Sequence, residues 1–129
     1  MAPSGRYVVA VVDDDSRILE SLGLLLESAG YETRLYSSAE TLLKIDGGLA
    51  DLDCLISDID MPVKDGFELQ RAAKVAMPSL PVILITGRHD LAKMARTARD
   101  RAEGLFQKPF HSADLLEAVS KAVARSSHN

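Results

Sequence analysis

Segments typical of strands alternate with segments typical of helices five times along this chain, and this alternation limits the folds that the chain can adopt. The strand-like segments are short and rich in β-branched or alternating apolar residues, and they span 7–12, 32–36, 54–58, 81–85 and 104–107. The helical segments have apolar residues three or four apart, and they span 16–29, 37–45, 66–76, 90–101 and 112–124. Strands separated by helices form a parallel sheet with helices on both faces. The sequence therefore predicts a doubly wound α/β fold of five strands and five helices.

The stretch from Cys54 to Gly66 is predicted to place the carboxylate of Asp58 at the edge of this sheet. An apolar run ends on Asp58, and Pro62 prevents a central strand from continuing because proline has no N–H to donate. Gly66 completes the turn into the next helix, because glycine adopts backbone angles that are closed to other residues. Asp58 is therefore expected at the carboxyl end of a central strand, which is where sheets of this kind bind ligands.

The composition fits one globular domain and excludes several classes of protein. The chain has 129 residues, of which 47% are hydrophobic, so we expect a single domain with a core from about residue 7 to residue 124. A net charge of −4 gives no indication of nucleic-acid binding. The single cysteine, Cys54, excludes an internal disulfide and indicates a reducing compartment. There is no signal peptide and no apolar run of about 20 residues, so we expect a cytoplasmic protein that does not enter a membrane.

Polar residues stand at the ends of four of the five predicted strands. Asp13 and Asp14 follow the first strand, Asp58 ends the third, Thr86 follows the fourth and Lys108 follows the fifth. Because the carboxyl ends of parallel strands lie on one edge of a sheet, these side chains are expected to converge on one pocket.

The chemistry of these side chains indicates a site for a phosphoryl group. Three carboxylates held close together repel one another, so they raise each other's proton affinity or bind a cation. A hard ion such as Mg²⁺ is the cation that such oxygen ligands hold. The Lys108 ammonium and the Thr86 hydroxyl then match the oxygens of a phosphoryl group in transfer. Asp58 is the expected acceptor, because its carboxylate on the central strand stands between the cation and Lys108.

Four short motifs at the strand ends resemble those of a known family. They are Val11–Asp15, Asp58–Pro62 with Gly66, Ile85–Gly87 and Lys108–Phe110. In this order they resemble the receiver domain of bacterial two-component response regulators, above all the receivers of nitrogen-fixation-type transcription regulators. The resemblance extends over nearly the whole chain. It implies a flavodoxin-like sheet with strand order 2-1-3-4-5 and a single receiver domain over residues 1–129.

The resemblance also implies a role for each residue of the pocket. Asp58 takes the phosphoryl group, and Thr86 and Lys108 contact it. Mg²⁺ is then held directly by Asp58 and Asp14, mainly through water by Asp13, and by the backbone carbonyl of Asp60. The peptide bond between Lys108 and Pro109 is expected to be cis.

The function that the resemblance implies is signalling. The domain would take a phosphoryl group from the phosphohistidine of a sensor histidine kinase or a histidine phosphotransfer protein, and would then change conformation. It would catalyse only its own phosphorylation and dephosphorylation, and would bind no nucleic acid itself. Any homodimer would form through the face made by the fourth helix, the fifth strand and the fifth helix. His89, His111 and His128 lie outside the motifs, so the phosphodonor is expected to be a separate protein.

Two positions depart from the pattern of the family. Leu105 stands where the family usually has an aromatic residue, which moves inward when the threonine binds the phosphoryl group. Its neighbour Phe106 points to the opposite face of the strand and is expected in the core, so we expect a muted conformational switch. Asp100 and Arg101 replace the usual Ala-Gly, so the end of the fourth helix is expected to be longer or differently wound.

Two charged residues flank the predicted pocket. Asp60 lies two residues after Asp58, and Arg88 lies two residues after Thr86. Because neighbouring loops carry these opposite charges, the two side chains are expected either to pair across the entrance or to be solvated independently.

An aspartyl phosphatase of the haloacid-dehalogenase type is the alternative from another class. Asp58 and Asp60 form the Asp-x-Asp pair that such enzymes use, but their nucleophile ends the first strand and a late acidic pair binds Mg²⁺. In this chain the acidic pair, Asp13 and Asp14, comes first. A flavin-binding flavodoxin is disfavoured, because carboxylates after the first strand repel a cofactor phosphate.

Overall fold

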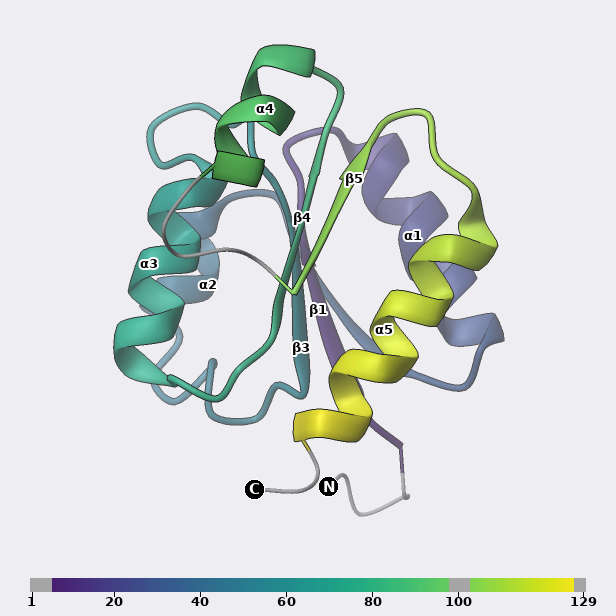
Figure 1. The fold of residues 1–129 in the computed structure, drawn as a ribbon. Helices are drawn as coiled ribbons and strands as arrows, with labels where there is room; N and C mark the ends of the chain where they lie inside the picture. The colour runs from purple at the N-terminus through teal and green to yellow at the C-terminus, as the bar shows by residue number, and fades with distance from the viewer. Residues whose placement is uncertain (1–5, 98–102, 127–129) are drawn as a thin grey trace.

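A five-stranded parallel sheet forms the centre of the computed structural model, which describes residues 6–97 and 103–126 (Figure 1). The strands follow the order 2-1-3-4-5 across the sheet, as the family resemblance implies. They are β1 (Val8–Val12), β2 (Glu32–Tyr36), β3 (Cys54–Asp58), β4 (Val82–Thr86) and β5 (Gly104–Gln107). The predicted parallel sheet is therefore confirmed, and each strand lies within one residue of its expected start or end.

Helices cover both faces of this sheet. They are α1 (Ser16–Ser28), α2 (Ala39–Lys44), α3 (Gly66–Ala76), α4 (His89–Thr97) and α5 (Ser112–Ser126). Helices α1 and α5 lie against one face, whereas α2, α3 and α4 lie against the other (Figure 1). The predicted doubly wound α/β architecture is therefore confirmed.

The two hydrophobic cores lie between the sheet and these two layers of helices. Alternation along β1 sends Ala10 toward the layer of α2 and α3, and sends Val9 and Val11 toward the layer of α1 and α5. Every residue of β1, β3 and β4 is buried. Burial of this kind fixes the register of the central strands, because a slip of one residue would exchange the two faces. The ends of these strands are therefore held at fixed positions.

Side-chain caps begin three of the described helices. The N-cap of α1 is Asp15, whose side chain accepts the N–H of Arg17. The N-cap of α2 is Ser38, so this helix begins at Ala39 and not at residue 37, as predicted. A full capping box begins α3, where Asp65 and Glu68 exchange hydrogen bonds. An N-cap residue has extended backbone angles, and the residue types alone do not reveal which of two neighbouring residues adopts them.

An ion pair at the amino edge of the sheet fixes the start of β5. The Lys74 ammonium lies 2.8 Å from the Glu103 carboxylate and donates to the Leu80 carbonyl, also at 2.8 Å. The second oxygen of Glu103 accepts the N–H of Val82 at 2.9 Å. This arrangement ties α3 to the first residues of β4 and β5.

The ends of the described chain share that amino edge. β1 begins there, and α5 runs back from the carboxyl edge to end there (Figure 1). Asp100 and Arg101, for which we expect an altered helix end, lie outside the described residues. Among the described helices, none has the length and apolar character that crossing a bilayer requires.

Gly66 should tolerate no side chain, because the backbone of the loop after β3 passes close to it. A Cβ atom at this position would lie 2.5 Å from the Asp58 carbonyl oxygen and 2.7 Å from the Ile59 Cα. Gly66→Ala should therefore lower the free energy of unfolding in urea by about 2 kcal/mol. Gly87→Ala is the matched control, because no atom lies within 4 Å of its added Cβ. Equal stability of the two variants would contradict this prediction.

Candidate functional site

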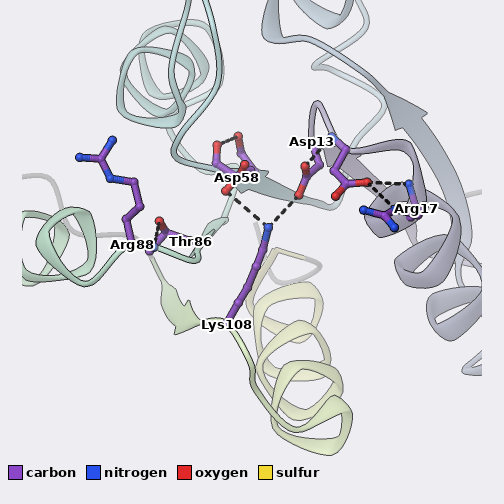
Figure 2. A network of polar contacts seen from close by, with 8 residues as sticks. Asp13, Arg17, Asp58, Thr86, Arg88 and Lys108 are labelled. Carbon is purple, nitrogen blue, oxygen red and sulfur yellow. Dashed lines mark hydrogen bonds and ion pairs between the residues drawn. The ribbon is translucent and has the colours of Figure 1, made fainter.

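The carboxyl ends of four strands bring the predicted site residues together (Figure 2). Asp13 follows β1, Asp58 is the last residue of β3, Thr86 is the last residue of β4, and Lys108 follows β5. Figure 2 shows the Lys108 side chain reaching across the edge to the two carboxylates. Asp13, Asp58 and Lys108 therefore meet at one edge of the sheet, as predicted, and Thr86 ends the neighbouring strand at the same edge.

The Lys108 ammonium is the positive centre of the pocket. Its Nζ lies 3.3 Å from Oδ2 of Asp13 and 3.8 Å from Oδ1 of Asp58. The side chains of Asp13, Asp58 and Lys108 are 1%, 8% and 25% exposed, respectively. Because water screens these charges little, the ammonium and the carboxylates interact more strongly than a pair at the surface.

Backbone hydrogen bonds hold the loops that carry these groups. The Lys108 N–H donates to the Thr86 carbonyl at 2.7 Å, which continues the β4–β5 pairing into the pocket. The Ile59 N–H donates to the Ile85 carbonyl at 2.9 Å, and so fixes the residue directly after Asp58. The pocket is therefore built on strand ends, not on free loops. The Lys108–Pro109 peptide bond is cis, as expected.

Three carboxylates form a cluster that could hold a cation. Oxygen atoms of Asp13, Asp14 and Asp58 all lie within 4.8 Å of one another. Two of these side chains are buried, and the third, Asp14, is exposed. A set of hard oxygen donors with one side open to solvent suits a divalent ion that keeps part of its water shell.

Burial and mutual repulsion shift the proton affinity of this cluster. Burial, and then the charge of Asp13, raise the pKa of Asp58 from the usual 3.8 to about 6, although Lys108 acts in the opposite direction. Burial also raises the pKa of Asp13, against the N–H of Asp15 and the Lys108 ammonium. The single ammonium therefore does not offset the full negative charge, which favours a bound cation.

Thr86 presents its hydroxyl group at the same edge. The side chain is fully buried, and its oxygen accepts the backbone N–H of Arg88 at 3.0 Å. A hydroxyl that accepts one hydrogen bond still has its own hydrogen to donate. Thr86 can therefore donate to an anionic oxygen in the pocket without losing its contact with Arg88.

An arginine lies between two carboxylates beside the pocket. Arg88 lies 3.6 Å from Asp60, which confirms the pair across the entrance and not independent solvation. Arg88 also binds Asp90 through two nitrogens, at 2.8 Å and 3.3 Å. The second partner was missed from the sequence, where Asp90 was expected only to begin the fourth helix.

The two neighbours on β5 point to opposite faces of the sheet, as predicted. Phe106 is partly buried and packs against the core beneath α1 and α5, and its ring centroid lies 5.6 Å from that of Phe110. Leu105 packs against the other core. His89 and His111 are exposed and lie outside the carboxylate cluster. The prediction that Phe106 belongs to the core is therefore confirmed.

A family model matches most of the chain. Residues 9–120 match the model described as the response regulator receiver domain. This range contains all of the site residues predicted from the sequence. The matches give no support to a phosphatase of the haloacid-dehalogenase type.

Individual relatives and solved structures agree with this match. Response regulator protein TmoT of Ectopseudomonas mendocina is 36% identical over 90% of this chain and 52% of its own length. Transcriptional regulatory protein FixJ of Bradyrhizobium diazoefficiens is 30% identical over 92% of this chain and 57% of its own length. The chain thus spans about half the length of the curated relatives that it matches. The crystal structure of a response regulator receiver domain protein from Clostridium thermocellum is 30% identical, with a TM-score of 0.80 over 94% of this chain and 97% of that one.

The raised pKa of Asp58 predicts a pH-dependent effect of its removal in metal-free protein. Because the pKa of Asp58 in the folded protein lies above the usual 3.8, the ionised carboxylate destabilises the fold. The free energy of unfolding therefore falls as the pH rises from about 4 to about 6. Asp58→Asn should therefore raise the free energy of unfolding at pH 7 by about 2 kcal/mol, and the gain should vanish near pH 4. Urea unfolding of both proteins in EDTA, at pH 4 and at pH 7, measures this difference in the free energy of unfolding.

Asp15→Asn is the control for that measurement. The N–H of Arg17 lowers the pKa of Asp15, so its ionised form stabilises the fold. Loss of this charge should give no gain in stability at pH 7. A gain from Asp58→Asn that is the same at pH 4 and pH 7 would show that charge is not its cause.

Proposed function

The chain belongs to the response regulator receiver family, and from this premise we propose that it accepts a phosphoryl group on Asp58 from a phosphohistidine of a partner protein. The partner is a sensor histidine kinase or a histidine phosphotransfer protein. The phosphorylated domain then changes conformation and so passes on the signal. Its only catalytic activities are its own phosphorylation and dephosphorylation.

The different environments of two buried carboxylates support Asp58 as the acceptor. Both oxygens of Asp13 are engaged, one by the N–H of Asp15 at 2.9 Å and the other by Lys108 at 3.3 Å. Asp58 lies farther from the Lys108 ammonium, at 3.8 Å. Its raised pKa shows that its surroundings stabilise the ionised carboxylate only weakly. An oxygen in this environment is the better nucleophile toward phosphorus.

Each side chain of the pocket has a part in the transfer. An Asp58 oxygen forms a bond to phosphorus while the bond from phosphorus to the donor's imidazole nitrogen breaks, and the imidazole leaves with the electron pair. Lys108 and Thr86 bind the phosphoryl oxygens and hold the group in line with Asp58. Mg²⁺, held by Asp13, Asp14, Asp58 and the backbone carbonyl of Asp60, would neutralise charge on the same oxygens.

We also propose a biological role, domain bounds and a dimer face for this chain. Relatives about twice as long include a protein named as a transcriptional regulator, which supports a role in regulating transcription. Residues 1–129 form one receiver domain with a core over 7–124, and this domain binds no nucleic acid directly. Any homodimer uses the face of α4, β5 and α5. A location in the cytoplasm remains a prediction from the sequence.

Phosphorylation of Asp58 is the direct test of this proposal. Incubation with acetyl phosphate and Mg²⁺ should add one phosphoryl group by intact-mass spectrometry, because acetyl phosphate can replace the phosphohistidine donor. Asp58→Asn should remain unlabelled. Equal labelling of this variant would place the acceptor elsewhere.

The cation site should depend on Asp14 and not on Asp15. Asp14→Ala removes a carboxylate of the cluster, so Mg²⁺ should bind at least about tenfold more weakly in a titration. Asp15→Ala is the matched control, because Asp15 caps α1 and lies outside the cluster. Equal weakening in both variants would show that the acidic run is assigned in the wrong register.

A further inference from the structure

Arg88 connects the loop after β3 to the first turn of α4. Its guanidinium lies 3.6 Å from the carboxylate of Asp60, which belongs to the loop that follows the acceptor strand. It also forms two hydrogen bonds to Asp90, the second residue of α4, at 2.8 Å and 3.3 Å. One side chain therefore bridges the acceptor loop and α4.

The backbone of Arg88 contacts the pocket as well. Its N–H donates to the Thr86 hydroxyl oxygen at 3.0 Å, and Figure 2 shows the two residues side by side. In the same view the guanidinium of Arg88 is directed away from Lys108, the cation that faces Asp58. The backbone of Arg88 is therefore tied to Thr86, whereas its guanidinium is held by Asp60 and Asp90.

Asp90 is the closer of the two carboxylates, but both ion pairs of Arg88 are weak. The side chains of Arg88, Asp60 and Asp90 are 54%, 56% and 62% exposed, so neither ion pair is buried. Exposed pairs of this kind contribute little to stability. A change of one charge nearby can therefore move the guanidinium from one carboxylate to the other.

Phosphorylation supplies such a change. The charge of Asp60 already acts on Asp58, where it contributes to the raised pKa of that carboxyl group. A phosphoryl group on Asp58 adds about one further negative charge on this side of Arg88. The added charge draws the guanidinium toward Asp60 and the phosphoryl oxygens, and Asp90 loses its partner.

We propose that Arg88 transmits phosphorylation of Asp58 to α4 by exchanging Asp90 for Asp60 and the phosphoryl oxygens. Without Arg88, the Asp90 carboxylate keeps only its interactions with backbone N–H groups in the first turn of α4, among them that of Leu91. The first turn of α4 then takes up a new position. This inference rests on the proposed phosphorylation of Asp58.

NMR of the activated domain tests the exchange. The parent protein and Arg88→Ala are each compared with and without Mg²⁺ and beryllofluoride, an analogue of the phosphoryl group. In the parent, amide signals of α4 should shift on activation. In Arg88→Ala these shifts should fall to less than half, while the signals of Asp58, Thr86 and Lys108 still move.

Two further variants sharpen the test. In Asp90→Asn, the amide signals of α4 should already lie nearer to the activated positions before beryllofluoride is added, because Arg88 has lost its stronger partner. Arg17→Ala is the matched control, since Arg17 is another exposed arginine at the same edge and pairs with Asp15 on α1. Its α4 shifts should equal those of the parent.

The outcomes separate this inference from the proposed function. If acetyl phosphate and Mg²⁺ add no phosphoryl group to the parent, the proposed function fails. If the parent and Arg88→Ala are both phosphorylated and their α4 shifts are equal, the transmission by Arg88 is wrong. Faster loss of phosphate from Arg88→Ala, with full α4 shifts, would likewise overturn it and assign Arg88 to the control of water access.

Discussion

Repulsion among carboxylates at the ends of β1 and β3 is the constraint on which the rest of the structure depends. Asp13, Asp14 and Asp58 are held within reach of one another, and Lys108 is the ammonium that faces two of them. Such an arrangement persists only because the surrounding strands are buried and cannot move apart. The stability of the core therefore keeps this unfavourable cluster of negative charges assembled.

The sequence predicts most of this site, because the residues that matter are tied to strand ends. β1 and β4 are apolar up to the polar residue that marks their end, whereas the apolar run of β3 ends at Ile56, two residues before Asp58. Parallel strands then place Asp13, Asp58 and Thr86 on one edge whatever the details of the loops. The opposite directions of Leu105 and Phe106 follow from strand alternation alone, and the structure confirms them.

Some contacts between side chains of separate elements could not be predicted from the sequence. Lys74 and Glu103 form a partly buried ion pair at the amino edge, yet they lie 29 residues apart and belong to no motif. Arg88 lies closer to Asp90 than to Asp60, because Asp90 is only two residues away along the chain whereas Asp60 belongs to a different loop. Partner choice of this kind depends on distances of a few tenths of an ångström, which composition and spacing do not encode.

The placement of the two chain ends has a consequence for how such a domain can be built into larger proteins. Because β1 begins and α5 ends at the amino edge, a polypeptide joined at either end departs on the side away from the pocket (Figure 1). The carboxylate cluster and a polypeptide joined at either end thus lie at opposite ends of the strands. A further module can therefore be joined to this domain without covering the edge that carries Asp58.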